Sequence, residues 1–178
     1  MANADTPFGF KATGVMSGLQ PFLTGTSSAT AIFNGDLISA LGAGTVEAAA
    51  ANSQSLLGAV AGGVTVTTNK NIIAASTAGT ILAHWDPDQV YIAQAQTGDS
   101  VAQSDLFANA DHVAGAGDTN TGISGHELDI GAISTTATGG FKLLDFVRRD
   151  DNDITAANAE YKCVINTGEG LLKLITGL

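Results

Sequence analysis

Residues 141–166 decide the fold, and they read FKLLDFVRRDDNDITAANAEYKCVIN. Tyr161, Cys163 and Ile165 fall on one side of a period-two pattern, and Lys162, Val164 and Asn166 fall on the other, which is typical of a strand with one buried face. Residues 141–147 are more uniformly apolar and predict a strand covered on both faces. We expect these two strands to pair antiparallel. The acidic connector, residues 148–159, is too long for a two-residue turn and is expected to be an exposed loop.

The chain has 178 residues and a single cysteine, Cys163. This length suits one domain, which buries roughly 70% of its unfolded surface and needs neither metals nor disulfides to form a core. Cys163 lies on the apolar side of the second predicted strand. We therefore expect a buried thiol there and not a nucleophile.

The formal net charge is −10, and through Gly140 the chain has only two basic residues against eleven acidic ones. Such a chain has no basic surface for nucleic acid or for an anionic membrane. The N-terminus lacks the basic and apolar regions of a secretory signal, so synthesis in the cytoplasm is expected. The longest apolar run, residues 56–66, is interrupted by glycines and predicts no transmembrane helix.

Other strands are predicted from short apolar or alternating runs that end at turn residues. They are residues 29–41 around an Asn34-Gly35 turn, residues 56–68 with a bend at Gly62-Gly63 and an alternating end at 64–67, residues 80–85 and 90–95 as a hairpin around residues 86–88, and residues 128–138. Residues 42–55 predict a loop with one helical turn, and residues 98–125 a turn-rich loop. Many short strands without a long amphipathic helix predict an all-β fold, an antiparallel β-sandwich or a jelly-roll-like barrel.

The first 25 residues differ from the rest, because proline and glycine interrupt them too often for regular structure to grow. We expect residues 1–25 to form an extended N-terminal arm that places its large apolar side chains on another protein. The alternative is an edge strand folded back onto its own domain. Residues 26–178 are expected to form a single β domain, in which residues 168–178 are a closing strand or a docked tail of open role.

Three isolated histidines, His84, His112 and His126, lack the spacing of a zinc site. We expect His84 near a strand end and the other two in polar loops. The segment 122–125, GISG, lacks the spacing of a nucleophilic serine turn. Lysines preceded by glycine, which a phosphate-binding loop requires, are also missing. No cofactor site and no enzyme are expected.

The acidic run at residues 150–153, DDND, invites comparison with a calcium loop. A loop that begins at Asp151 has Ala156 where the turn needs glycine and Lys162 where a bidentate glutamate is needed. This spacing excludes an EF-hand. We expect a solvated acidic turn and no metal site.

Four places in the chain resemble the capsid cement, or head decoration, protein family of tailed bacteriophages. They are ANADTPFGFK at 2–11, FNGD at 33–36, NAD at 109–111 with GISGHELD at 122–129, and RDDNDI at 149–154 with Asn158-Ala159 and residues 161–166. The resemblance covers nearly the whole chain in the family's order. The chain departs from the family at residues 168–178, which continue beyond the usual end of the pattern.

The resemblance implies a β-sandwich or jelly-roll-like protein of the virion, located on the outer surface of the capsid. Its expected partners are the major capsid protein and other copies of itself, as a dimer or trimer, and its expected role is to stabilise contacts between capsid subunits. The expected capsid contacts are Pro7, Phe8, Phe10 and Phe22. An alternative is a carbohydrate-binding β-sandwich on the virion for host or mucus attachment. That function needs clustered exposed aromatics, and the chain has one Trp and two Tyr.

Overall fold

The computed structural model describes residues 3–14, 18–52, 55–63, 72–96, 98, 101–135, 139–166 and 170. Eleven strands and one short 3-10 helix lie in this described part of the chain. They are β1 Lys11–Thr13, β2 Leu19–Thr24, β3 Leu37–Ala40, β4 Val46–Ala48, β5 Leu56–Gly63, β6 Gly79–His84, β7 Val90–Gln94, η1 Gln103–Asp105, β8 Asn109–Asp118, β9 Ile123–Ser134, β10 Phe141–Phe146 and β11 Glu160–Ile165. The predicted all-β class is confirmed.

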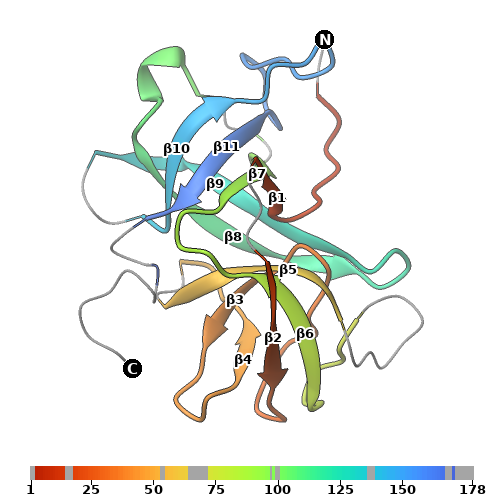
Figure 1. Cartoon of the computed structure of the whole chain (residues 1–178). Coiled ribbons are helices and arrows are strands. Elements are labelled where there is room, and N and C mark those ends of the chain that lie inside the picture. Colours follow the sequence, from red (N-terminus) through yellow and green to blue (C-terminus); the bar gives the residue numbers. More distant parts are fainter. Residues whose placement is uncertain are drawn as a thin grey trace.

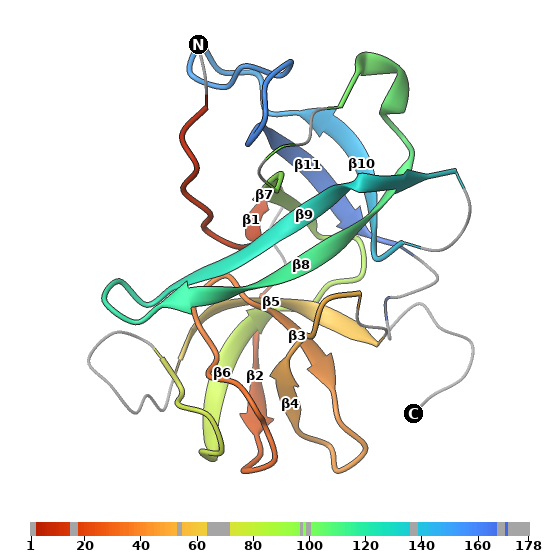
Figure 2. The ribbon, with the colours of Figure 1, turned by 180° about the vertical axis from the view of Figure 1, so that it is seen from behind.

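The strands form two units that stack on each other (Figure 1). One unit is a six-stranded sheet in the order β1-β7-β11-β10-β8-β9, in which all neighbours are antiparallel. The other unit is a small closed barrel in the order β2-β4-β3-β5-β6. Its one parallel contact joins β2 to β4 at the single pair Thr24 and Val46. The long β8–β9 hairpin of the sheet crosses the molecule on the side next to the barrel, as both ribbon views show (Figures 1 and 2).

The predicted antiparallel pair at residues 141–166 is confirmed, since Phe141 of β10 lies opposite Ile165 of β11. The prediction that β10 is covered on both faces is wrong. Phe141, Leu143 and Phe146 are buried, whereas Lys142 is exposed. A register shift between Leu143 and Asp145 explains why the buried face moves from position 143 to position 146.

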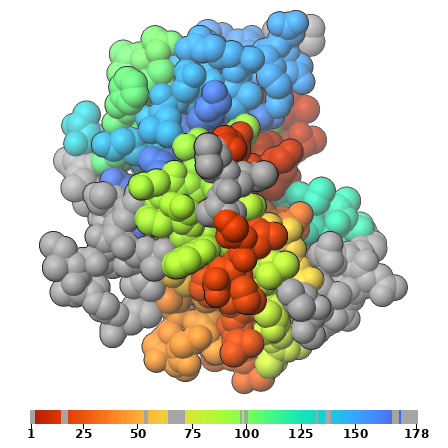
Figure 3. Space-filling model, viewed as in Figure 1, coloured from red at the N-terminus to blue at the C-terminus, as the bar shows by residue number. Residues whose placement is uncertain are grey.

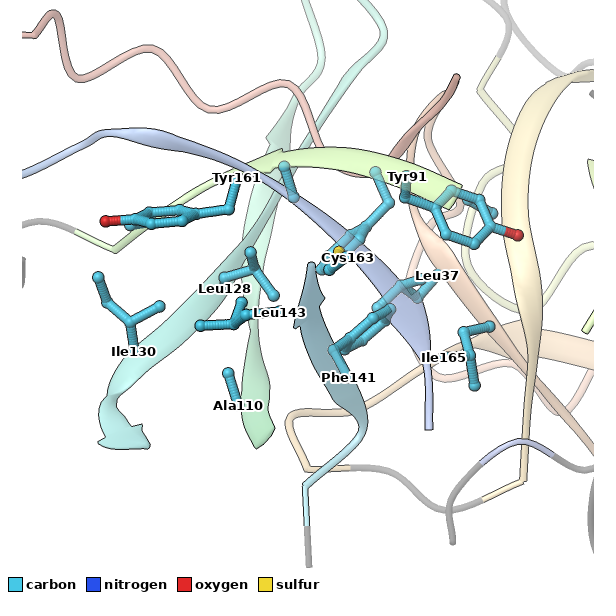
Figure 4. Close-up of a cluster of buried hydrophobic side chains, with 14 of the residues drawn as sticks. Leu37, Tyr91, Ala110, Leu128, Ile130, Phe141, Leu143, Tyr161, Cys163 and Ile165 are labelled. Carbon is cyan, nitrogen blue, oxygen red and sulfur yellow. The ribbon is translucent and has the colours of Figure 1, made fainter. Parts of the chain in front are cut away.

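The core has two parts, one under the sheet and one inside the barrel. Figure 4 shows side chains from β7 to β11 pointing into the first part, where the Cys163 side chain is fully buried as predicted. Leu37 of β3 and Leu56 of β5 also belong to this cluster, although both strands form the barrel. The two units are therefore joined by shared apolar packing.

Three predictions of local structure are wrong. The strands at 80–85 and 90–95 exist as β6 and β7, but they pair in different units and form no hairpin. The predicted loop at 42–55 contains β4, and the predicted loop at 98–125 contains all of β8. The bend predicted at Gly62-Gly63 coincides with a register shift in β5 between Val60 and Gly62. The alternating end at 64–67 and the tail, except Gly170, lie outside the described residues.

Two segments of the predicted arm are strands of the fold. Residues 11–13 form β1 at one edge of the sheet, and residues 19–24 form β2 beside β6. This corresponds to the folded-back alternative for those segments. The extended part, residues 3–10, runs along the sheet (Figure 1) and ends at Phe10, whose side chain is 1% exposed.

We expect Phe10→Ala to lower the free energy of unfolding by about 3 to 5 kcal/mol, because it leaves a cavity in the shared core. Urea denaturation followed by circular dichroism measures this change. Leu23→Ala is the control, since Leu23 is 62% exposed and its truncation should alter stability by less than about 0.5 kcal/mol. Equal effects from the two substitutions would contradict the placement of Phe10.

Candidate functional site

The candidate site begins where the N-terminal segment meets the turn at residues 33–36. The Phe10 amide donates a hydrogen bond to the Gly35 carbonyl at 2.8 Å. Gly9 and Gly35 both have left-handed backbone, with φ of +75° and +93°. A Cβ at Gly9 would lie 2.3 Å from the Gly35 oxygen, and a Cβ at Gly35 would lie 2.5 Å from the Phe8 oxygen. Only glycine permits this backbone approach.

The same turn is tied to the start of β9. The Asn34 amide donates to the Gly122 carbonyl at 3.1 Å, and the Ser124 amide donates to the Asn34 carbonyl at 2.9 Å. On the other side, the Gly35 amide donates to the Val60 carbonyl of β5 at 2.8 Å. The turn at 33–36 therefore connects the arm, the β8–β9 hairpin and the barrel. We call this connection the junction.

Residues 3–6 are anchored separately, on the acidic connector and β7. The Asn3 side chain donates to the Asp153 and Ala157 carbonyls at 2.9 and 3.0 Å, and the Asp153 amide donates back to Asn3 Oδ1 at 2.7 Å. Gln94 donates to the Ala4 and Asn158 carbonyls, at 2.9 and 3.1 Å. These bonds hold the arm on its own domain.

A cleft of about 600 Å³ opens beside the junction. The arm, the 33–36 turn, β5 and the ends of β6 and β9 contribute to its walls, together with β7 and the 148–160 region. Its lining residues are Phe8, Phe10, Lys11, Ala12, Asn34, Gly35, Val60, Ala61, His84, Ile92, Ile123, Arg149 and Glu160. Most of these side chains are apolar, and such walls suit an apolar side chain from a ligand or from another protein.

Two cationic side chains line the cleft, and their surroundings differ. Arg149 donates to both carboxylate oxygens of Glu160, at 3.1 and 2.7 Å, and to Asp151 at 2.9 Å. These hydrogen bonds raise the pKa of Arg149, and the bond from Arg149 lowers the pKa of Asp151. Lys11, in contrast, forms no ion pair with any described residue. It is the cation of the cleft that remains available to a partner.

A buried polar cluster lies next to the junction, formed by Asp36, His112 and His126. The Leu37 amide donates to His126 Nδ1 at 3.3 Å, which leaves the proton of the neutral ring on Nε2. That Nε2 atom lies 3.6 Å from Asp36 Oδ1. The ring of His112 stacks on that of His126 with centroids 5.9 Å apart. The prediction that His112 and His126 lie in polar loops is wrong, because both are buried on β8 and β9.

Burial shifts the pKa values of all three cluster members toward their neutral forms. It raises the pKa of Asp36 to about 6, against smaller lowering effects of hydrogen bonds from Ser124 and the Phe33 backbone. It lowers the pKa of His112 to about 4 and that of His126 to about 3. His112 also contributes to the lowered pKa of His126. The cause is the low local dielectric, which disfavours charge.

Ser124 and His126 are not arranged as a nucleophile and its base. His126 Nδ1 accepts the Leu37 amide and Nε2 carries the ring proton, whereas Ser124 Oγ accepts the backbone amide of His126 at 2.9 Å. The His126 ring therefore has no free nitrogen lone pair to take a proton from Ser124. No group of three or more His, Cys, Asp or Glu residues in the described ranges could hold a metal ion. These ranges also contain no helix of the length and apolar character that a membrane crossing needs.

The four expected contact residues have different environments. Phe8 is half-buried and lines the cleft, and Pro7 beside it is also half-buried. Phe10 is in the core, so its side chain is not available to a partner in this structure. Phe22 is partly buried against the barrel core.

The large apolar side chains that are exposed differ from the four expected contact residues. Those in the described part of the chain are Leu19, Leu23, Trp85, Phe107 and Ile123. Because successive side chains of a strand point to opposite faces, the run LQPFL at 19–23 places Leu19 and Leu23 on one face and Phe22 on the other.

The fold and the site together define an all-β chain with a surface cleft. No protein-family model matches the chain, and no curated protein sequence matches it either.

The burial of His112 predicts how the stability of the protein changes with pH. A histidine with a folded pKa of about 4 and an ordinary value of 6.5 is protonated first in the unfolded chain, so its contribution to stability falls from pH 6.5 to about 4. As the pH falls from 6.5 to about 4, we expect the free energy of unfolding of His112→Phe to rise by about 3 kcal/mol relative to that of the wild type. Urea denaturation at a series of pH values measures the difference. A difference that does not change with pH would contradict a buried, neutral His112.

Proposed function

We propose that this chain is a head decoration protein of a tailed bacteriophage, which binds the outer capsid surface and stabilises contacts between major capsid subunits. One observation carries the proposal. The segments that resemble the family meet in space: residues 8–10 contact the 33–36 turn and Ser124, and Asn3 contacts Asp153 and Ala157. Segments far apart in the sequence thus form one connected structural unit, which supports a relation of the whole chain to the family.

The outer face of β2 is the proposed capsid-binding surface. Along this strand Leu19, Pro21 and Leu23 are exposed, with Leu19 at 46% and Leu23 at 62%, whereas Phe22 packs toward the barrel core and Thr24 is buried. The strand carries no charged residue, although the net charge of the chain is −10. Figure 3 shows this strand at the surface of the barrel. Binding there removes apolar area from water without desolvating a charge.

The edge of β2 favours contact by side chains over the addition of a strand. All six residues of β2 pair with β6, but only Thr24 pairs with β4, so most of the second edge lacks a strand partner among the described residues. Pro21, in the middle of this strand, has no amide proton to donate to an added strand. Proline on an edge strand prevents unwanted strand pairing. The capsid is therefore expected to meet the face of β2.

Weak contacts of this kind suffice when many copies bind one shell. Each copy buries a few apolar side chains, and any linkage between copies turns later binding steps into intramolecular ones. An acidic exterior keeps a protein displayed in many copies soluble. The arm contributes by fixing the barrel to the sheet and not by reaching away from the domain. Deletion of residues 1–22 would remove Phe10 and most of β2, so point substitutions test the surface better.

We expect the double substitution Leu19→Ser with Leu23→Ser to weaken binding to capsids that lack the chain by about 30- to 100-fold, because it removes most of the apolar area of the β2 face. Co-sedimentation with such capsids over a range of protein concentrations measures the affinity. Val164→Ser is the matched control, since Val164 is a half-buried apolar residue on β11 of the sheet. Unchanged binding by the folded double variant would contradict the proposed surface, and absence of the chain from purified virions would contradict the function.

A further inference from the structure

Phe107 has an unusual environment for a large apolar residue. Its side chain is 70% exposed, the highest value among the exposed large apolar side chains that the structure describes. Its φ is +71°, in the left-handed region that bulky residues avoid. Its neighbours have ordinary positions: Leu106 packs against the sheet core, and Ala108 is buried. The chain therefore places Phe107 alone in solvent.

The local backbone explains the conformation. Leu106 has φ −60° and ψ 144°, and the Ala108 amide donates to the Asp105 carbonyl at 3.2 Å, so residues 105–108 form a type II turn with Phe107 in third position. The Phe107 amide also donates to the Leu143 carbonyl at 3.0 Å, and the Leu143 amide donates to the Ala108 carbonyl at 3.0 Å. Phe107 and Ala108 thus lie opposite the single residue Leu143, as in a β-bulge whose first residue has left-handed backbone. Phe107 is therefore both the third residue of the turn and the first residue of the bulge, and glycine is favoured at each of these positions.

Folding gives no reason for a phenylalanine at this place. A left-handed backbone is unfavourable for such a residue, and its exposed ring gains little from burial. The turn itself is well fixed, since Asp105 Oδ2 accepts the Ala102 amide at 2.9 Å and the Asp105 amide donates back to the Ala102 carbonyl at 3.0 Å. A rigid turn that presents an aromatic ring is typical of an anchor residue in an interface.

A complementary surface exists on the same chain. The cleft beside the junction has apolar walls that include Phe8, Val60 and Ile92, and it is lined by Lys11, the cation without an ion pair among the described residues. The Phe107 turn carries Asp105 two residues before the ring. An acidic turn with an apolar tip matches an apolar cleft with a basic residue at its wall.

We propose that copies of this chain associate by inserting Phe107 of one copy into the cleft of the next, with the Asp105 turn near Lys11. The contact joins two different surfaces, so all of them are used either in a two-fold dimer, where the two copies exchange the contact, or in a larger ring. This inference concerns the free protein and does not depend on capsid binding. If the copies do not associate through Phe107, the proposal that β2 binds the capsid still stands. If β2 does not bind the capsid, the proposal of self-association still stands.

The first test is Phe107→Asn, because asparagine tolerates left-handed backbone. We expect this variant to be at least as stable as the wild type in urea while its self-association weakens about 30-fold or more. Sedimentation velocity over a range of concentrations measures association without capsids. Leu23→Asn is the control, with a similarly exposed leucine, and should associate as the wild type does. A wild type that stays monomeric, or a Phe107→Asn variant that associates normally, overturns the proposal.

The second test maps the contact with cysteines on separate chains. A mixture of Phe107→Cys and Ala61→Cys proteins should form a disulfide-linked heterodimer on mild oxidation, because Ala61 is exposed and lines the cleft. The native Cys163 is fully buried and gives a low background. Lys11→Glu in the Ala61→Cys chain should reduce the yield by opposing Asp105. A yield no higher than that of Leu23→Cys mixed with Ala61→Cys overturns the contact, even where the protein is oligomeric.

Discussion

The hydrogen bond from the Phe10 amide to the Gly35 carbonyl joins the two units of this structure, and much of the remaining architecture depends on it. It forms because Gly9 and Gly35 have no side chains at a place where their backbones come into contact. Immediately after this bond, the Phe10 ring stacks on Phe141 at 4.6 Å and meets Tyr91 edge-on at 6.5 Å. The first strand of the sheet and the turn that precedes β3 of the barrel are thereby held in one geometry.

The junction also explains the buried polar cluster. The turn that brings Gly35 to Gly9 places Asp36 inside, where its Oδ2 accepts the Phe33 amide at 2.8 Å. β9, which the turn holds through Asn34 and Ser124, carries His126 to the same place. A carboxyl and two imidazoles thus become buried because the backbone contacts require it, and their pKa shifts are the consequence. The cluster is a result of the way the units are joined.

The sequence predicts what is local and fails where partners are distant. The period-two pattern of β11 and the apolar run of β10 are local signals, and their pairing was predicted correctly. β6 and β7 were also found, but adjacent strands usually pair, and nothing local shows that the barrel takes one and the sheet the other. The glycines and aspartates of β8 look like turn residues, which is why the sequence predicts a loop at His112 and not a strand. Neither the cleft nor the left-handed Phe107 has a sequence signal, since Leu106-Phe107 reads as an ordinary apolar pair.

The two proposed surfaces lie on different units, and this separation has a physical advantage. β2 belongs to the barrel, whereas the turn before β8 that carries Phe107 is at the far end of the sheet, and both ribbon views show them at opposite ends of the molecule (Figures 1 and 2). The cleft lies between them, at the junction. Contacts between copies would therefore leave the β2 face free for the shell. Because the Phe10 contact fixes barrel and sheet to each other, binding at one end would not have to order the other, and this preorganisation lowers the entropic cost of assembly.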